Sequence, residues 1–271
     1  MLAIDPGVVA WLALAEFLYV RAVRTLRQRG VTVSKGQQTC WHGGVGLQAL
    51  GLLSPIDVLG EQLLSAHMAQ HLLIADIAAP LMLAGLRTPV LVFMLPKPAL
   101  VALARRARLR RLVRQMRQPL VAIAIYAVTL YGWHFDFAFQ AALKYPAVHA
   151  LQHASFVGAG VLVWWSALEP KRRRMRGELW KIGHLLGARL VGMFLGMGFV
   201  IIRVPVYTDA YGSGPRALGL DSLADQQIAG AMMVVTDIFL MMFALTFFFL
   251  RAGQQADEDA RAAAPPQAGV T

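Results

Sequence analysis

The sequence predicts an all-α integral membrane protein, a bundle of seven transmembrane helices. Three observations support this class. Of the 271 residues, 57% are hydrophobic and only 15% are charged, and the mean hydropathy is +0.54, which is unusual for a soluble domain. Seven segments have the length and apolar character to cross about 30 Å of hydrocarbon, which takes about 20 helical residues. The connections between these segments alternate in charge.

The predicted helices are apolar runs bounded by charged or turn-forming residues. They cover residues 7–26, 38–56, 63–85, 118–138, 147–168, 181–203 and 227–250. The second run has the weakest signal, because it is rich in glycine and ends at Ser54 and Pro55. A crossing is predicted there mainly because the charge alternation requires one.

The chain divides into a transmembrane domain, residues 1–251, and a tail, residues 252–271. The tail is rich in Ala, Pro, Gln and acidic residues and lacks the apolar periodicity of a packed helix. We therefore expect it to be disordered and cytoplasmic.

Basic residues gather in every second connection. The 27–37, 86–117 and 169–180 connections are rich in Arg and Lys, whereas the intervening loops carry mostly Asp and Glu. The positive-inside rule places the three basic connections in the cytoplasm, the N-terminus outside and the C-terminus inside. The first helix has its arginines after the apolar run, which predicts a retained anchor and not a cleaved signal peptide.

The formal net charge of +11 does not indicate nucleic acid as a partner, because the basic residues lie in short runs between apolar segments. The arginine-rich run 105–117 is explained by topology and by attraction to anionic membrane lipids. A single cysteine, Cys40, excludes an intramolecular disulfide and every CxxC motif.

Five of the seven histidines are expected at one depth, near the outer ends of their helices. Two pairs have i, i+4 spacing, which places both rings on one helical face and lets them reach a single metal ion. Asp225 and Gln226 open the seventh helix at the same level. The candidate ligands are His67, His71, His134, His149, His153, Asp225 and Gln226. Imidazole and carboxylate donors suit copper, zinc or iron, and the sequence leaves these three open.

Other polar or soft side chains in the predicted spans are left outside this site. Asp76 follows His67 by nine residues, which is about 180° around an α-helix, so it is expected to pair elsewhere in the bundle. Glu16 is expected to be a buried carboxylate and has no partner that the sequence identifies. Methionines such as Met68 and Met233 are interpreted as packing residues, because thioethers commonly fill irregular gaps.

Four stretches carry a family resemblance: "SAHMAQHLLIADIAAPLMLAGLRTPV", "YGWHFDFAF", "VHALQHASFVGAGVLVWW" and "DQQIAGAMM". In this order they resemble the CtaG family of caa3-type cytochrome c oxidase assembly factors, over roughly residues 40–250. The resemblance implies a seven-helix protein of the cell inner membrane that matures haem-copper oxidase by handling copper. The implied partners are oxidase subunits or other assembly factors, and the seven candidate ligands are the matching positions.

The leading hypothesis is a non-enzymatic assembly factor that takes copper at the outer face and presents it to the oxidase. The alternative is a membrane metalloenzyme of the zinc hydrolase type, with Asp225 as the base. A third possibility is haem ligation, in which one histidine from each pair would supply an axial ligand. Metal analysis, turnover of a lipid or amide substrate, and a Soret band distinguish the three.

Overall fold

The computed structural model describes residues 5–168, 179–212 and 217–263. These residues are almost entirely helical, and no strand occurs among them. The prediction of an all-α protein is confirmed. The basic loop predicted at 169–180 lies largely outside the described residues.

Five helices in the described residues are long and apolar enough to cross a membrane. They are α1 (Pro6–Gln28), a composite helix over Leu64–Gly85, α11 (Pro146–Leu168), α12 (Leu179–Ile201) and α14 (Ser222–Ala263). A sixth candidate is the pair α9 (Pro119–Trp133) and α10 (Asp136–Lys144), whose axes meet at 73°. The chain is therefore a multi-pass membrane protein with five or six candidate spans.

Two of the seven predicted segments differ from the expectation. The segment 118–138 is not one straight helix, because α9 ends at Trp133 and the chain turns sharply before α10. The glycine-rich segment 38–56 is helical as α2 (Lys35–Leu53), but it is not among the helices with enough apolar character for a span. The number of seven membrane crossings therefore stays a prediction.

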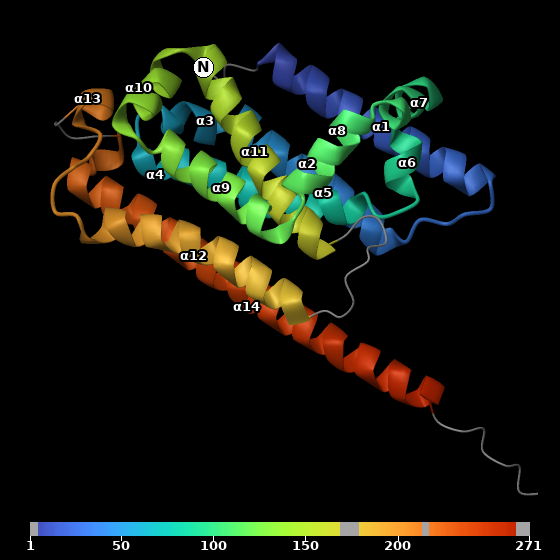
Figure 1. Ribbon diagram of the computed structural model, residues 1–271. Coiled ribbons are helices and arrows are strands. Elements are labelled where there is room, and N and C mark those ends of the chain that lie inside the picture. Colours follow the sequence, from blue (N-terminus) through green and yellow to red (C-terminus); the bar gives the residue numbers. More distant parts are fainter. Residues whose placement is uncertain (1–4, 169–178, 213–216, 264–271) are drawn as a thin grey trace, which may run out of the picture.

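The long helices run alternately between two ends of the molecule (Figure 1). One end holds the start of α1, the short helices α3 (Pro55–Gly60) and α13 (Thr208–Tyr211), and α10. The other end holds α6 (Val90–Met94), α7 (Lys97–Arg105) and α8 (Ala107–Met116), and α14 leaves the bundle in that direction.

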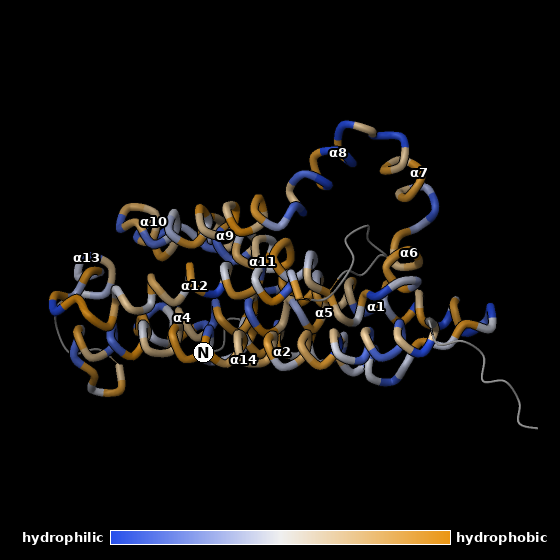
Figure 2. The backbone as a smooth tube through the Cα atoms, turned by 60° about the horizontal axis from the view of Figure 1, so that its bottom comes forward, coloured by the Kyte–Doolittle hydropathy of each residue, from blue (hydrophilic) through white to orange (hydrophobic). Residues whose placement is uncertain are grey.

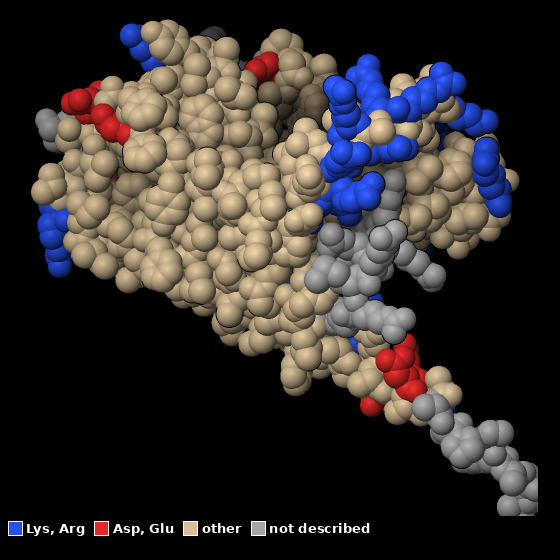
Figure 3. All heavy atoms as spheres, in the orientation of Figure 1, with Lys and Arg blue, Asp and Glu red and all other residues tan. Residues whose placement is uncertain are grey.

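The end with α7 and α8 is strongly basic. The hydrophilic stretch of α8 stands apart from the apolar bundle (Figure 2), and Lys and Arg side chains gather over α7 and α8 (Figure 3). Every arginine of α8 is exposed. The arginine-rich run 105–117 thus lies at one end of the bundle. The positive-inside rule expects basic residues to gather at one end in this way.

The tail prediction needs a correction, because α14 continues to Ala263 and residues 252–263 are helical. Ala, Gln, Glu and Arg favour helix, and extending an existing helix avoids the cost of nucleation. Apolar periodicity is needed for packing but not for such an extension. Residues 264–271 of the predicted tail lie outside the described residues.

The centre of the fold is the composite helix, built from α4 (Leu64–His71), a π-helix η1 (Leu72–Ala78) and α5 (Ala79–Gly85). Pro80 explains the wide turn, because proline has no N–H for the carbonyl four residues earlier and its ring clashes with that carbonyl in an α-helix. Gln48 of α2 donates to the carbonyl of Ile74 at 2.8 Å, which satisfies a backbone acceptor within the π turn.

Close helix contacts fix the neighbours of this centre. A Cβ on Gly160 of α11 would lie 2.6 Å from the carbonyl oxygen of Ala75, so only glycine lets α11 approach η1. Gly196 of α12 and Gly230 of α14 face each other in the same way. Small residues allow such backbone approach in membrane bundles.

A buried ionic cluster joins three of the helices. Arg189 of α12 donates to Asp76 of η1 and, at 3.1 Å, to Asp237 of α14, and its guanidinium lies 4.9 Å from the ring centre of Tyr126. All three charged residues are buried. The expectation that Asp76 pairs elsewhere in the bundle is confirmed.

Replacing Arg189 by Met should destabilise the fold by about 3–5 kcal/mol, because two buried carboxylates would lose their cation. Thermal unfolding in detergent would measure the loss. Adding Asp76→Asn and Asp237→Asn to Arg189→Met should recover part of it by removing the uncompensated charges. An Arg189→Met protein that unfolds at the wild-type temperature would contradict this account.

Candidate metal centre

Four histidines from two helices meet inside the bundle. His67 and His71 project from α4, and His149 and His153 from α11. Within each helix the ring centres are 4.3 and 4.2 Å apart, as the i, i+4 spacing predicts. Between the helices, His67 lies 5.3 Å from His149, and His71 lies 5.1 Å from His153. We call these residues the four-histidine cluster.

The cluster contains six buried ring nitrogens that form no hydrogen bond of normal geometry among the described residues, although the buried side chain of Gln152 on α11 lies beside His67. They are both nitrogens of His67 and of His71, and Nε2 of His149 and of His153. His67 is fully buried and His71 is 6% exposed. Because buried polar atoms are normally paired, this concentration of unpaired nitrogens fits a bound cation as the missing partner.

The geometry of the cluster suits a metal ion. One nitrogen from each of His67, His71 and His149 lies within 4.8 Å of the other two. Nitrogen ligands bind zinc at about 2.0–2.1 Å, which places two ligands of one ion roughly 3–4 Å apart. Small rotations of the rings would bring the three nitrogens to that spacing.

Two of the predicted site residues are engaged elsewhere. Asp225 accepts hydrogen bonds from the backbone N–H groups of Leu64 and Ser65 and from the Ser65 hydroxyl, at 2.8, 3.0 and 2.5 Å. It thus satisfies the first turn of α4, to which its negative charge is also suited. Gln226 accepts from the N–H of Val206 and donates to backbone carbonyls near the end of α12, which ties that loop to α14.

His134 lies near the four-histidine cluster but is not part of it. It follows Trp133 at the bend between α9 and α10. Its ring contacts Phe156 and Phe199, and no ring contact with another imidazole occurs among the described residues. Its Nδ1 lies 2.7 Å from the carbonyl oxygen of Leu130, and its Nε2 lies 3.5 Å from Sδ of Met68.

Aromatic side chains shield the cluster. Phe139 lies 5.1 Å from the His67 ring and stacks on Tyr207 at 4.0 Å, and Phe156 lies 4.6 Å from the His71 ring. The Tyr207 hydroxyl donates to the carbonyl of His134 at 2.8 Å. Burial, aided by the negative charge of Asp136, raises the pKa of Tyr207 above its usual value, so this hydroxyl keeps its proton.

Two acidic side chains lie near the cluster. Asp57 and Glu61 are close enough to His149 to interact with it electrostatically. Gln70 of α4 donates to Asp57 at 2.7 Å and to the carbonyl of Gly51 at 2.9 Å, which holds α3 against α4. Negative charge at this position favours the arrival of a cation.

The π-helix changes where Asp76 points. In a continuous α-helix, Asp76 would lie on the opposite face from His67. A π turn takes about one residue more than an α turn, so it rotates the following residues relative to those before it. His71 and Asp76 consequently line the same cavity.

Sequence reasoning gave Arg189 and Asp237 no role. A sequence signal for this pairing was present. Asp76, Arg189 and Asp237 each lie within a different predicted span, and acidic and basic residues inside spans usually pair within the bundle. Glu16 was expected to be buried, but its side chain is 34% exposed and contacts His42 at 2.7 Å and Trp41 at 3.0 Å.

These observations define a class: a multi-pass helical membrane protein with a buried cluster of imidazoles. The family model for the cytochrome c oxidase caa3 assembly factor (Caa3_CtaG) matches residues 17–255. The chain belongs to this family, as the resemblance of its histidine motifs implied. No curated protein and no solved structure matches the chain.

Asp225→Ala should destabilise the protein by about 2 kcal/mol, because buried donors at the start of α4 would lose their acceptor. Asp225→Asn keeps an acceptor oxygen and should cost less. Both variants should retain the metal content of the wild type, measured by elemental analysis beside thermal unfolding. Loss of metal from a stably folded Asp225→Asn protein would place Asp225 in the ligand set.

Proposed function

We propose that this assembly factor binds a copper ion through the four-histidine cluster and passes it to a cytochrome c oxidase subunit or to another assembly factor. The observation that carries the proposal is the set of six buried ring nitrogens that form no hydrogen bond of normal geometry within the described part of the chain. Polar groups inside an apolar bundle are costly, and a cation would satisfy several of them at once.

We propose copper as the bound metal, and not zinc or iron, on the basis of the family and of the ligand atoms in the cluster. The family assembles an oxidase of the haem-copper class, whose maturation requires copper delivery. The cluster offers imidazole nitrogen, which copper binds well. Neutral imidazole also holds a metal less tightly than thiolate and loses it on protonation, which suits transfer.

We further propose that the cluster faces the outer side of the cell inner membrane. The cluster lies toward the end that holds α3 and α10, and the basic helices α7 and α8 gather at the other end (Figure 1, Figure 3). If basic segments stay in the cytoplasm, α2 forms a further crossing, the N-terminus lies outside and the C-terminus inside. The exposed arginines of α8 would then meet anionic lipid headgroups.

The arrangement supports binding and transfer better than catalysis. The zinc hydrolase hypothesis assigned Asp225 as the base, but this carboxylate accepts three hydrogen bonds from the start of α4. It is therefore committed to holding the helix that carries His67 and His71. We propose a non-enzymatic role on this ground.

Replacing His67 and His71 together by Gln should remove most of the copper that the purified full-length protein binds after loading with Cu(II). Each neutral imidazole offers one ligand nitrogen, so the two residues supply two of the three ligands that lie close together, and the remaining pair on α11 would be a weak site. Elemental analysis of detergent-solubilised protein measures the copper-to-protein ratio.

His42→Gln is the matched control, because His42 is 47% exposed and pairs with Glu16 outside the cluster. This variant should bind as much copper as the wild type. Wild-type protein that stays free of copper after loading, or a double variant with undiminished copper, would refute the proposal.

A further inference from the structure

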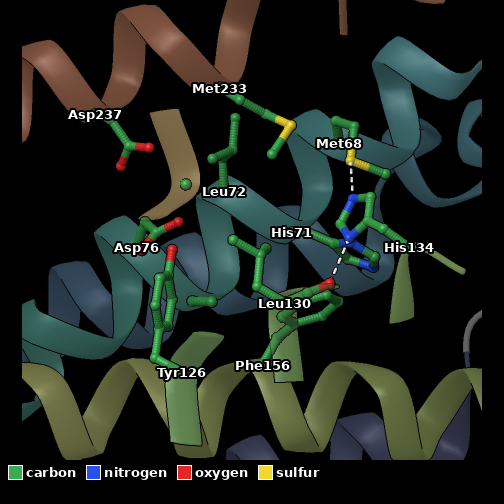
Figure 4. A pocket seen from close by; sticks show the side chains of 12 residues that line it. Met68, His71, Leu72, Asp76, Tyr126, Leu130, His134, Phe156, Met233 and Asp237 are labelled. Carbon is green, nitrogen blue, oxygen red and sulfur yellow. Dashed lines mark hydrogen bonds between the residues drawn. The ribbon is translucent and has the colours of Figure 1, made fainter. Parts of the chain in front are cut away.

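A small cavity lies beside the four-histidine cluster, between α4, η1, α9, α11 and α14. Its volume is about 30 Å³, enough for an ion or for one or two water molecules. Figure 4 shows Met68, His134 and Met233 around it, with His71 behind and Asp76, Tyr126 and Asp237 at the far side. His71 therefore belongs to both the cluster and the cavity wall.

In the neutral tautomer that its other contact requires, His134 has no proton to share with Met68. A carbonyl oxygen only accepts, so the 2.7 Å contact with Leu130 requires the proton of the neutral ring on Nδ1. Nε2 then carries a lone pair, and it lies 3.5 Å from the Met68 sulfur, which also has only lone pairs to offer. Two electron-pair donors thus face each other without a hydrogen between them.

We propose that His134 and Met68 form a second metal site, selective for Cu(I), with Met233 as a further sulfur donor. An electron-pair acceptor is what two facing lone pairs require, and thioether sulfur favours the soft cuprous ion over zinc and Cu(II). The site differs from the four-histidine cluster in donor type and takes its ligands from α4, the α9–α10 bend and α14.

The spacing of the two donors fits one ion. With metal–nitrogen and metal–sulfur bonds of about 2.0 and 2.3 Å, donors 3.5 Å apart subtend an angle of about 110° at the metal, which is tetrahedral. Met68 and Met233 belong to the same buried cluster and are 2% and 4% exposed.

The ring of His134 is held in place for this role. Its backbone carbonyl accepts from Tyr207, its Nδ1 is anchored on Leu130, and Phe156 and Phe199 pack against the ring. Such anchoring of the second nitrogen is the usual way that metal-binding histidines are oriented. The apolar side chains of Leu72, Leu130 and Phe156 on the cavity wall limit the access of water.

The two sites are close enough to act in sequence. Met68 follows His67 on α4, and His71 reaches both the cluster and the cavity. This proposal extends the proposed copper-handling function by adding a cuprous site beside the imidazole site, and the experiment below separates the failure of either.

The test uses full-length protein in detergent, loaded with Cu(I) without oxygen and titrated with a cuprous chelator. Met68→Leu removes the sulfur at similar volume, and it should weaken binding of one Cu(I) by more than about tenfold. X-ray absorption of the loaded wild type should show sulfur at about 2.3 Å from copper. That signal should fall in Met68→Leu, and His134→Gln should weaken the same Cu(I) through loss of nitrogen.

Met82→Leu is the matched control, because Met82 lies against Gly44 of α2 and does not line the cavity. It should leave Cu(I) affinity and the sulfur signal unchanged. Copper without sulfur in the wild type, or equal affinity in Met68→Leu and Met82→Leu, would overturn the second site while leaving the imidazole site intact. The double variant His67→Gln with His71→Gln tests the imidazole site separately. If it keeps sulfur-bound copper and binds as much copper as the wild type, the imidazole site alone is overturned.

Discussion

The need to satisfy polar groups inside an apolar bundle governs this structure. The composite helix Leu64–Gly85 carries two imidazoles and a carboxylate through the middle of the fold, and each must find a partner within the protein. Asp76 finds Arg189. His67 and His71 lie mainly against other imidazoles and aromatic rings, and their ring nitrogens form no hydrogen bond of normal geometry among the described residues. Asp76 therefore belongs to the buried ionic cluster, whereas the two imidazoles belong to the candidate metal site.

The π-helix η1 brings the buried ionic cluster and the candidate metal site to one cavity. Its wide turn, next to Pro80, brings Asp76 round to the cavity that His71 also lines, and Gln48 satisfies a carbonyl within it. On the far side of that cavity, two carboxylates, Asp76 and Asp237, share the single cation of Arg189. These ion pairs join η1, α12 and α14 at the wall of that cavity.

Much of the candidate site could be predicted from the sequence. The i, i+4 pairs on α4 and α11 follow from helical periodicity, and alternating helix direction brought the two pairs to one height. Asp225 and Gln226 were predicted at the same height as the histidines. Helical periodicity does not predict which neighbouring group a polar side chain will bind. A carboxylate beside unpaired N–H groups at a helix start binds them first, and a glutamine beside exposed carbonyls does the same.

The sequence by itself determined the membrane class, the helical segments and the grouping of histidines, because hydropathy and periodicity are local properties of the chain. Only the tertiary structure decided that α9 and α10 bend apart at His134, that Asp76 meets Arg189 and that His134 faces Met68. These outcomes depend on which helices become neighbours and on one wide turn that shifts the helical register. Asp76 and Arg189 are 113 positions apart in the sequence, and Met68 and His134 are 66 positions apart. Contacts over such separations cannot be predicted from the sequence of any single segment.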